Sequence, residues 1–160
     1  MRWRSSSDGD SSCAEAVDQR VGEPFVHRLR VRYAECDSQG VVFNAHYLAY
    51  IDHSVTELWR AAYGGYERML ERGVDVVVAE ARLRFLRPAR FDHELDAEML
   101  VTHLGTTSLG SRHRVLDAGD GGVLLEADTR HVWIDRQTNR KTPIPDWARA
   151  GLERWYAPEP

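Results

Sequence analysis

The sequence predicts an α+β fold in which one long central helix is wrapped by a curved antiparallel sheet of about five strands. Two observations lead to this prediction. Residues 44–63 form the one long stretch in which apolar side chains recur at helical spacing, which predicts a helix with one broad buried face. Shorter stretches before and after it alternate apolar and polar residues, as half-buried strands do.

The chain begins with a polar segment of small residues, and residues 1–22 are predicted to be a disordered tail. Residues 23–160 are predicted to form a single domain, since this length can bury a substantial core. A first strand is expected over 25–33, where Leu29, Val31 and Tyr33 share one face.

A polar loop follows this strand, and Asn44 is predicted to be the N-cap of the long helix. Gly64 and Gly65 are expected to end that helix, because glycine tolerates the left-handed cap conformation. A short C-terminal helix is expected from about Asp146 to Trp155.

Four further strands are predicted over residues 74–85, 95–101, 107–117 and 123–134. The segment Val74–Val78 is apolar on both faces, which predicts cover on both sides. One helix covers only one face of a sheet, and sheet edges need partners. We therefore expect a homodimer, with a tetramer as the alternative.

Composition narrows the function classes. The net charge of −4 does not indicate binding to nucleic acid or to an anionic membrane surface. No run of about 18 apolar residues exists, so no membrane span is expected. Cys13 and Cys36 match neither a metal-ligand spacing nor a disulfide framework, so the prediction is a cytoplasmic protein without a metal.

The most informative segment is the loop Glu35-Cys36-Asp37-Ser38-Gln39-Gly40-Val41-Val42 before the helix. It resembles the 4-hydroxybenzoyl-CoA thioesterase family of hotdog-fold proteins, whose members carry acidic-x-Asp-x-x-Gly-hydrophobic-hydrophobic and then Asn-Tyr on a long helix. This chain has Ala45-His46-Tyr47 where Asn-Tyr is usual. The strand order agrees as well, from about Phe25 to Trp155. The resemblance implies a hotdog fold and an acyl thioesterase that uses no cofactor and acts on acyl-CoA or an acyl-carrier protein.

The chemistry of the residues is compatible with that activity. A helix N-terminus presents free backbone N–H groups and a partial positive charge, and Asp37 stands seven residues before Asn44 at that end. Asp37 could attack a thioester carbonyl carbon or deprotonate a water. The resemblance implies that Asp37 is catalytic and that a backbone N–H near Asn44 polarises the carbonyl. His46, in the first helical turn, is the candidate auxiliary acid or base.

The substrate is expected to contact the loop, the first helical turn, the apolar segment near Val76 and the turn before the strand at 107–117. The candidate residues are Gly40, Val41, Val42, Phe43, Tyr47, Val76, Val77, Thr107 and Ser108. Related CoA thioesterases place a basic cluster where this chain has residues 103–108, which contain no arginine or lysine. That difference keeps a carrier protein open as the acyl donor.

Two charged groupings have more than one interpretation. His46, Tyr50, His53, Glu57 and Arg60 share a helix face, which is typical of a solvated or subunit-facing stripe. Glu57 is a reserve catalytic candidate, because another branch of the hotdog thioesterases uses a helix carboxylate. Six arginines either form a cationic rim for CoA phosphates or belong to solvated strand faces: Arg82, Arg84, Arg87, Arg90, Arg112 and Arg114.

Two other functions compete with hydrolysis. A hotdog-fold dehydratase or hydratase would need a histidine paired with a carboxylate, and His46 with Asp37 or Glu57 is the available pair. A non-catalytic module that binds acyl thioesters would bind tightly without hydrolysis. Variants of Asp37, and an assay for water addition or loss on enoyl or 3-hydroxyacyl thioesters, would separate these functions.

Overall fold

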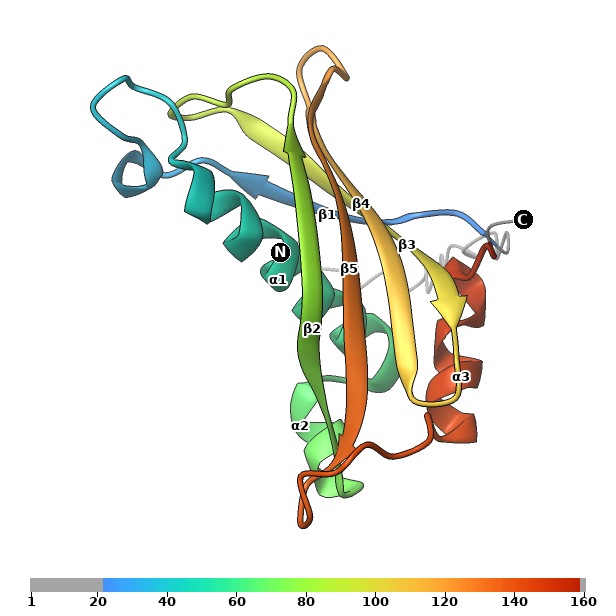
Figure 1. Cartoon of the computed structure of the whole chain (residues 1–160). Coiled ribbons are helices and arrows are strands. Elements are labelled where there is room, and N and C mark those ends of the chain that lie inside the picture. Colours follow the sequence, from blue (N-terminus) through green and yellow to red (C-terminus); the bar gives the residue numbers. More distant parts are fainter. Residues whose placement is uncertain (1–21, 159–160) are drawn as a thin grey trace, which may run out of the picture.

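Five antiparallel strands form one sheet that curves around helix α1, Asn44–Tyr63 (Figure 1). The computed structural model describes residues 22–158. The strand order is β1-β3-β4-β5-β2, and every neighbouring pair is antiparallel. The strands are β1 Phe25–Arg30, β2 Val74–Phe85, β3 Glu94–Leu104, β4 Ser108–Asp117 and β5 Val123–Asp135. This is the α+β hotdog architecture, and the prediction of the fold class is confirmed.

Helix α1 has the bounds that its periodicity predicts. Its buried side chains recur every three or four residues and include Tyr47, Ile51, Leu58 and Trp59. Gly64 ends the helix in the left-handed conformation, with φ +83°, and its N–H donates to the carbonyl of Arg60.

The N-terminus of α1 corrects one prediction. The N-cap is Phe43 and not Asn44, which is already the first helical residue. Phe43 has extended backbone angles, and its carbonyl accepts the N–H of His46 at 2.9 Å. No side chain makes a capping hydrogen bond there, so the first turn keeps its backbone donors open.

The core lies between α1 and the inner face of the sheet. Strand β3 alternates buried and partly exposed residues as predicted, and Leu95, Met99 and Val101 are completely buried. Strands β4 and β5 contribute Leu109 and Trp133, which are also completely buried. Each such side chain contributes about 1.5–3 kcal/mol of burial free energy.

Two further helices pack near the far end of α1. Helix α3, Asp146–Leu152, continues into a 3-10 turn, Glu153–Trp155, and so agrees with the predicted C-terminal helix. The hydroxyl of Tyr63 on α1 donates to the carbonyl of Ala148 at 3.0 Å. Helix α2, Tyr66–Glu71, was not predicted, because six residues are too few to display a helical period.

Strand β2 is an edge strand, which corrects the expected cover of Val74–Val78. Val74 is buried, but Val77 and Val78 are 42% and 54% exposed in the single chain. The apolar segment therefore faces outward at an edge that has no neighbour among residues 22–158.

Some predictions concern parts of the chain that the structure does not describe. The predicted tail falls on residues 1–22, of which only Gly22 is described, and Cys13 lies outside the described residues as well. Within residues 22–158, no helix is both long enough and apolar enough to cross a membrane.

Candidate active site

The first strand ends at Arg30 and not at Tyr33 as predicted, because the chain turns there into a short 3-10 helix, Tyr33–Glu35, in which Tyr33 is 81% exposed. The loop that carries Asp37 joins this 3-10 helix to the start of α1. Oδ1 of Asp37 accepts the N–H of Gln39 at 2.8 Å and, more weakly, the N–H of Val41 at 3.4 Å. The N–H of Asp37 donates to the carbonyl of Val41 at 2.9 Å. Gly40 has φ +72°, a left-handed conformation that favours glycine. The loop thus holds the carboxylate by Oδ1, and no described residue donates a hydrogen bond to Oδ2.

Backbone donors of the first helical turn lie at the end of this loop. The N–H of Val42 donates to the carbonyl of Ala89, and that of Phe43 to the carbonyl of Glu35, both at 2.9 Å. The next two N–H groups, of Asn44 and Ala45, have no acceptor within the helix by its geometry. Together with the helix dipole they favour a partial negative charge at this point.

Glu35 anchors the loop to the helix from inside the protein. Its side chain is 5% exposed, and Oε2 accepts both the N–H of Arg32 and the hydroxyl of Tyr50 at 2.7 Å. Oε1 accepts Nε of Arg32 at 2.9 Å. Burial alone would raise the pKa of Glu35, but the hydrogen bonds from Arg32 and Tyr50 outweigh it and hold that pKa below its usual value.

Tyr47, a predicted substrate contact, has a structural role in this arrangement. It is 3% exposed, and its hydroxyl oxygen accepts the N–H of Ala89 at 2.9 Å. An isolated bridge pairs Val41 with Arg90. The segment 86–93 between β2 and β3 is therefore fastened to both the Asp37 loop and the first turns of α1.

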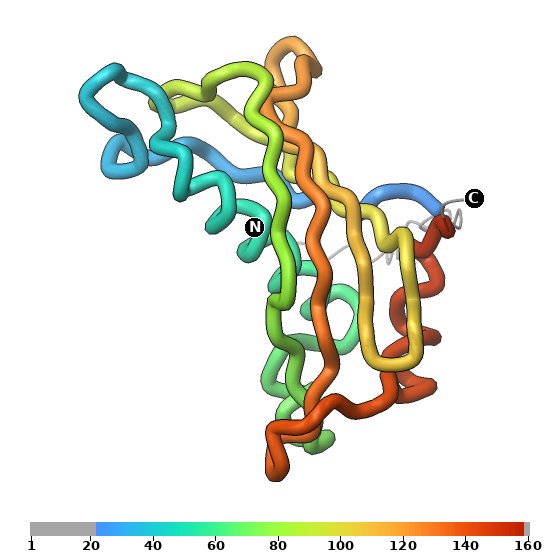
Figure 2. The backbone as a smooth tube through the Cα atoms, viewed as in Figure 1, coloured from blue at the N-terminus to red at the C-terminus, as the bar shows by residue number. Residues whose placement is uncertain are grey.

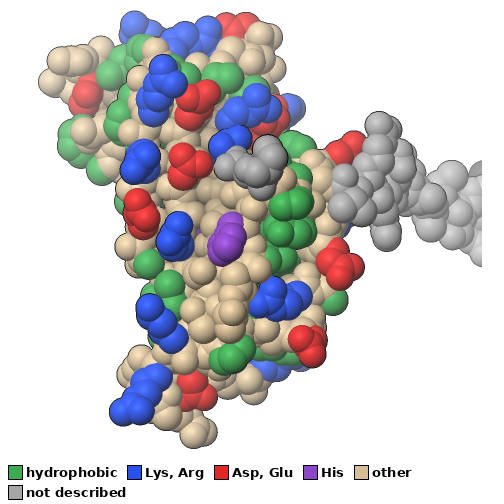
Figure 3. Space-filling model, turned by 45° about the vertical axis from the view of Figure 1, so that its right-hand side comes forward, with side chains coloured by type: hydrophobic (Ala, Val, Ile, Leu, Met, Phe, Trp, Pro, Cys, Tyr) green, Lys and Arg blue, Asp and Glu red, His purple; other side chains and the backbone are tan. Residues whose placement is uncertain are grey.

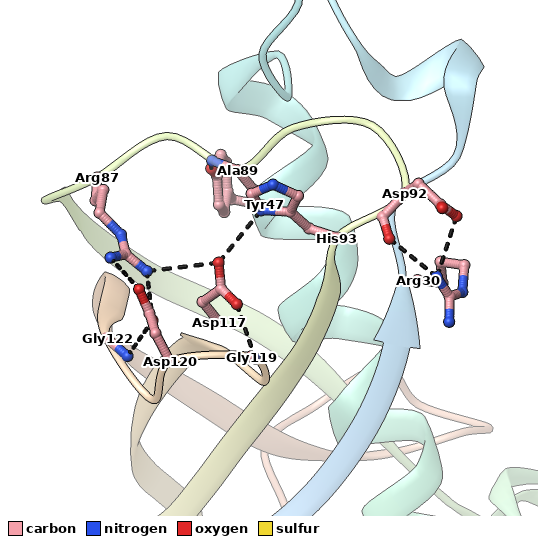
Figure 4. Close-up of polar contacts among 10 residues, drawn as sticks. All are labelled: Arg30, Tyr47, Arg87, Ala89, Asp92, His93, Asp117, Gly119, Asp120 and Gly122. Carbon is pink, nitrogen blue, oxygen red and sulfur yellow. Dashed lines mark hydrogen bonds and ion pairs between the residues drawn. The ribbon is translucent and has the colours of Figure 1, made fainter.

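A polar network holds the same segment from its other side (Figure 4). Arg87 donates to both carboxylate oxygens of Asp120, at 2.7 and 2.8 Å, and lies 3.5 Å from Oδ2 of Asp117. Nδ1 of His93 lies 3.3 Å from that same Oδ2. The hydrogen bond from Arg87 is the main cause that lowers the pKa of Asp120 to about 2. The connection between β2 and β3 is thereby tied to the turn between β4 and β5.

A cavity of about 250 Å³ opens beside the helix N-terminus. It is lined by Val42, Asn44, Tyr47, Phe85, Leu86, Arg87 and Pro88. Most of these side chains are apolar, and Phe85 and Leu86 are about half exposed. The cavity thus combines an apolar surface with the backbone donors of α1.

The structure brings together only part of the predicted site. Asp37, Gly40, Val41, Val42, Phe43, Asn44 and Tyr47 share the loop and the helix start. Val77 lies eight residues before Phe85, about 27 Å along β2, and Val76 lies one residue further. Thr107 and Ser108 lie at the turn between β3 and β4, at the opposite end of the sheet (Figure 2). Within one chain these four residues do not meet Asp37.

The helix stripe is not uniformly solvated. Tyr50 is buried against Glu35, while His53 stacks on His27 with ring centroids 4.7 Å apart. Glu57 forms a hydrogen bond with Arg60, which lowers its pKa, and lies 13 residues or about 20 Å along α1 from Asn44. His46 lies near Phe43, with ring centroids 6.4 Å apart, and forms no ion pair with a described carboxylate.

Most of the six arginines have acidic partners. Ion pairs join Arg84 to Glu126, Arg87 to Asp120, Arg112 to Asp128 and Arg114 to Glu98. Figure 3 accordingly shows cationic and anionic side chains interspersed over the face that it presents. Arg82 and Arg90 form no ion pair among residues 22–158.

A basic side chain does reach the turn near Gly105, but from a distant part of the chain. Arg149 on α3 donates to the carbonyls of Leu104 and Gly105. Sequence reasoning missed this contact, as it missed Arg87 with Asp117, because the partners are more than 25 residues apart. Over the described part of the chain, no three His, Cys, Asp or Glu side chains cluster as metal ligands would.

The anchoring role of Glu35 predicts a pH-dependent effect of Glu35→Gln. The folded-state pKa lies below the usual value of 4.5, so the ionised carboxylate stabilises the fold above that pH and loses this effect as pH falls through the folded pKa. We expect Glu35→Gln to lower the free energy of unfolding by about 2 kcal/mol at neutral pH. The difference from the wild type should shrink below pH ~4.

Chemical denaturation at a series of pH values measures this difference. Glu94→Gln is the matched control, because Glu94 is 44% exposed in its ion pair with Arg30 and should contribute little. An equal, pH-independent effect of the two variants would contradict the assignment.

Comparison with known proteins identifies the family. The profile described as the thioesterase-like superfamily matches residues 31–152. The acyl-CoA thioester hydrolase YbgC of Escherichia coli is 28% identical over 117 residues, which is 73% of this chain and 87% of that protein. A solved protein structure from Thermus thermophilus is 33% identical, with a TM-score of 0.74 over 81% of this chain and 98% of its own. A 1,4-dihydroxy-2-naphthoyl-CoA thioesterase from Synechocystis is similar in fold, with 19% identity and a TM-score of 0.74 over 81% and 95% of the two chains. The chain belongs to the thioesterase-like superfamily.

Proposed function

We propose that this protein hydrolyses an acyl-CoA thioester and that Asp37 is its catalytic carboxylate. One observation carries the proposal. The loop holds the carboxylate of Asp37 by Oδ1 and leaves Oδ2 open, and unpaired backbone donors lie nearby at the start of α1. Family membership supports the reaction class. Relatives described as an acyl-CoA thioester hydrolase and a 1,4-dihydroxy-2-naphthoyl-CoA hydrolase support CoA as the carrier.

In the proposed reaction the N–H groups of Asn44 and Ala45 donate to the thioester carbonyl oxygen and stabilise the negative charge that develops on it. Two routes then use the open Oδ2 of Asp37. In one, Asp37 attacks the carbonyl carbon, the CoA thiolate leaves and takes a proton, and water hydrolyses the resulting anhydride. In the other, Asp37 takes a proton from water, the hydroxide attacks, and the proton passes to the leaving thiolate.

Asp37→Asn should abolish turnover and leave the fold intact. The amide oxygen of asparagine can still accept the N–H of Gln39, so the loop keeps its turn, but the side chain can neither attack nor remove a proton. We expect kcat for acyl-CoA hydrolysis to fall by about 10³-fold or more. Thiol release assays measure this, with thermal denaturation as the test of folding.

Asp128→Asn is the matched control, since Asp128 is an exposed partner of Arg112 on another part of the sheet. Full hydrolytic activity of Asp37→Asn would refute the catalytic role. Treating the wild type with hydroxylamine during turnover separates the two routes, because only an anhydride intermediate yields a hydroxamate on the side chain of Asp37.

We also propose that two copies pair through the β2 edges. The strand is 12 residues long, lies at the edge of the sheet and exposes Val77 and Val78. Such an edge is a template for pairing with another strand. In a dimer, the partner's loops would approach the site of the first chain. Four predicted substrate contacts that lie far from Asp37 within one chain could then belong to the site of the other copy: Val76, Val77, Thr107 and Ser108.

Val78→Lys should weaken this dimer, because a charge must then be buried or repelled at the paired edge. Val26→Lys is the matched control, since Val26 is 49% exposed on the opposite edge strand β1. Sedimentation velocity measures the oligomeric state of both variants. A fully active monomer would contradict a site that depends on the pair.

The network around Asp117 is proposed to position the site. Asp117→Ala removes the carboxylate shared by Arg87 and His93 and should loosen segment 86–93, to which Val42 and Tyr47 bind. We expect kcat/KM to fall about tenfold or more, because small misplacements are costly in catalysis. Asp96→Ala, which breaks the ion pair with Arg28 instead, should leave kcat/KM nearly unchanged. Equal effects of the two variants would argue against the positioning role.

A further inference from the structure

A second cavity, of about 400 Å³, lies between α1 and strands β2 and β5. Its wall is mainly apolar and consists of Ala45, Leu48, Ala49, Ile51, Val55 and Val78. Three polar residues complete it: Asp52 on α1, and Thr129 and His131 on β5. An apolar cavity with a few convergent polar groups has the character of a small-molecule site.

The polar part belongs to a buried cluster on the inner face of β4 and β5. Ser111, His113, Thr129 and His131 are each 6% exposed or less. The hydroxyl of Thr129 forms hydrogen bonds with the hydroxyl of Ser111 at 3.0 Å and with Nε2 of His113 at 2.9 Å. Burial, with His131 nearby, lowers the pKa of His113 to about 3, so this histidine is neutral.

Two members of the cluster, Thr129 and His131, border the cavity, and His131 is the one that lacks hydrogen-bond partners. It is 4% exposed, and no described residue forms a hydrogen bond with either of its ring nitrogens. Its Nδ1 is enclosed by the protein, like Nδ1 of His113, whereas its Nε2 is not fully enclosed. Burial lowers its pKa although Asp52 acts in the opposite direction, so the ring is neutral and offers one donor and one acceptor. Nε2 is therefore the ring nitrogen that a molecule in the cavity can reach, and a hydrogen bond to that molecule would satisfy it.

The position of the cavity relates it to the proposed site. It begins at Ala45, whose N–H is one of the open donors, and follows α1 past Leu48 and Ala49. The distance along the helix from Ala45 is about 10 Å to Asp52 and about 15 Å to Val55. An acyl group whose carbonyl binds at the helix N-terminus can therefore extend along this wall until its far end reaches His131.

We infer that the acyl group of the substrate carries a hydroxyl or carbonyl oxygen at its far end and that His131 binds this oxygen. The inference rests on the proposed hydrolysis of acyl-CoA and specifies its substrate class. The apolar wall accommodates the hydrocarbon part, and His131 with Thr129 provides the hydrogen-bonding end. His131 is thus a specificity-determining residue, because an unsubstituted acyl chain would leave its ring unpaired.

The test compares a series of medium-chain alkanoyl-CoA thioesters with the ω-hydroxy counterpart of each. For the wild type we expect kcat/KM to favour the hydroxylated member by about tenfold or more at the best chain length. His131→Leu should remove or reverse that preference. His131→Gln should restore part of it, because the amide can also form a hydrogen bond.

His103→Leu is the matched control, since His103 is an exposed histidine on β3 outside this cavity, and it should keep the wild-type preference. Dissociation constants of the same pairs, measured by calorimetry in the Asp37→Asn background, provide a readout that needs no turnover. A preference for the hydroxylated ligand there supports the inference even if hydrolysis is absent.

Three results would overturn the inference and leave the proposed hydrolysis standing. The first is equal kcat/KM for both members of every pair. The second is an unchanged preference in His131→Leu. The third is a dimer structure in which a side chain of the second copy, or an enclosed water, already binds His131. Absence of hydrolysis for all thioesters would instead refute the proposed function. The ratio of the dissociation constants of each ligand pair would then still decide the role of His131.

Discussion

The buried carboxylate of Glu35 connects the parts on which the candidate site depends. It accepts the N–H and the guanidinium of Arg32 on one side and the hydroxyl of Tyr50 from α1 on the other. A carboxylate is costly to bury unless such donors surround it. Asp37 follows two residues later, and the N–H of Phe43 donates to the carbonyl of Glu35. The position of the Asp37 loop relative to the helix N-terminus therefore depends on the buried, hydrogen-bonded carboxylate of Glu35.

The sheet makes two different surfaces available to this site. Its outer face carries charge pairs across neighbouring strands, such as Arg114 with Glu98, and needs no partner to be satisfied. Its inner face is mostly apolar but contains the cluster around Thr129, in which both histidines are neutral because of burial. Polar groups inside an apolar layer restrict what can fill the adjacent space, which is the physical basis for selectivity in the cavity along α1.

Local periodicity predicted most of the fold. The bounds of α1 and the succession of strands follow from side-chain spacing, and the strand order agrees with the fold class inferred from the loop around Asp37. The same reasoning misplaced Tyr50 on a solvated stripe and the N-cap at Asn44. Spacing reports which residues share a helix face, but it does not report which distant group, here Glu35, lies against that face.

The sequence by itself determined the secondary elements, the turn at Gly40 and the identity of the loop that carries Asp37, because these depend on neighbours a few residues apart. Only the tertiary structure decided which side chains support that loop, since the contacts of Arg87 with Asp117 and Asp120 join residues 30 or more positions apart. It also decided that β2 is an edge and that His131 borders a cavity. Both features arise from the order in which strands pair, which periodicity within a strand does not encode.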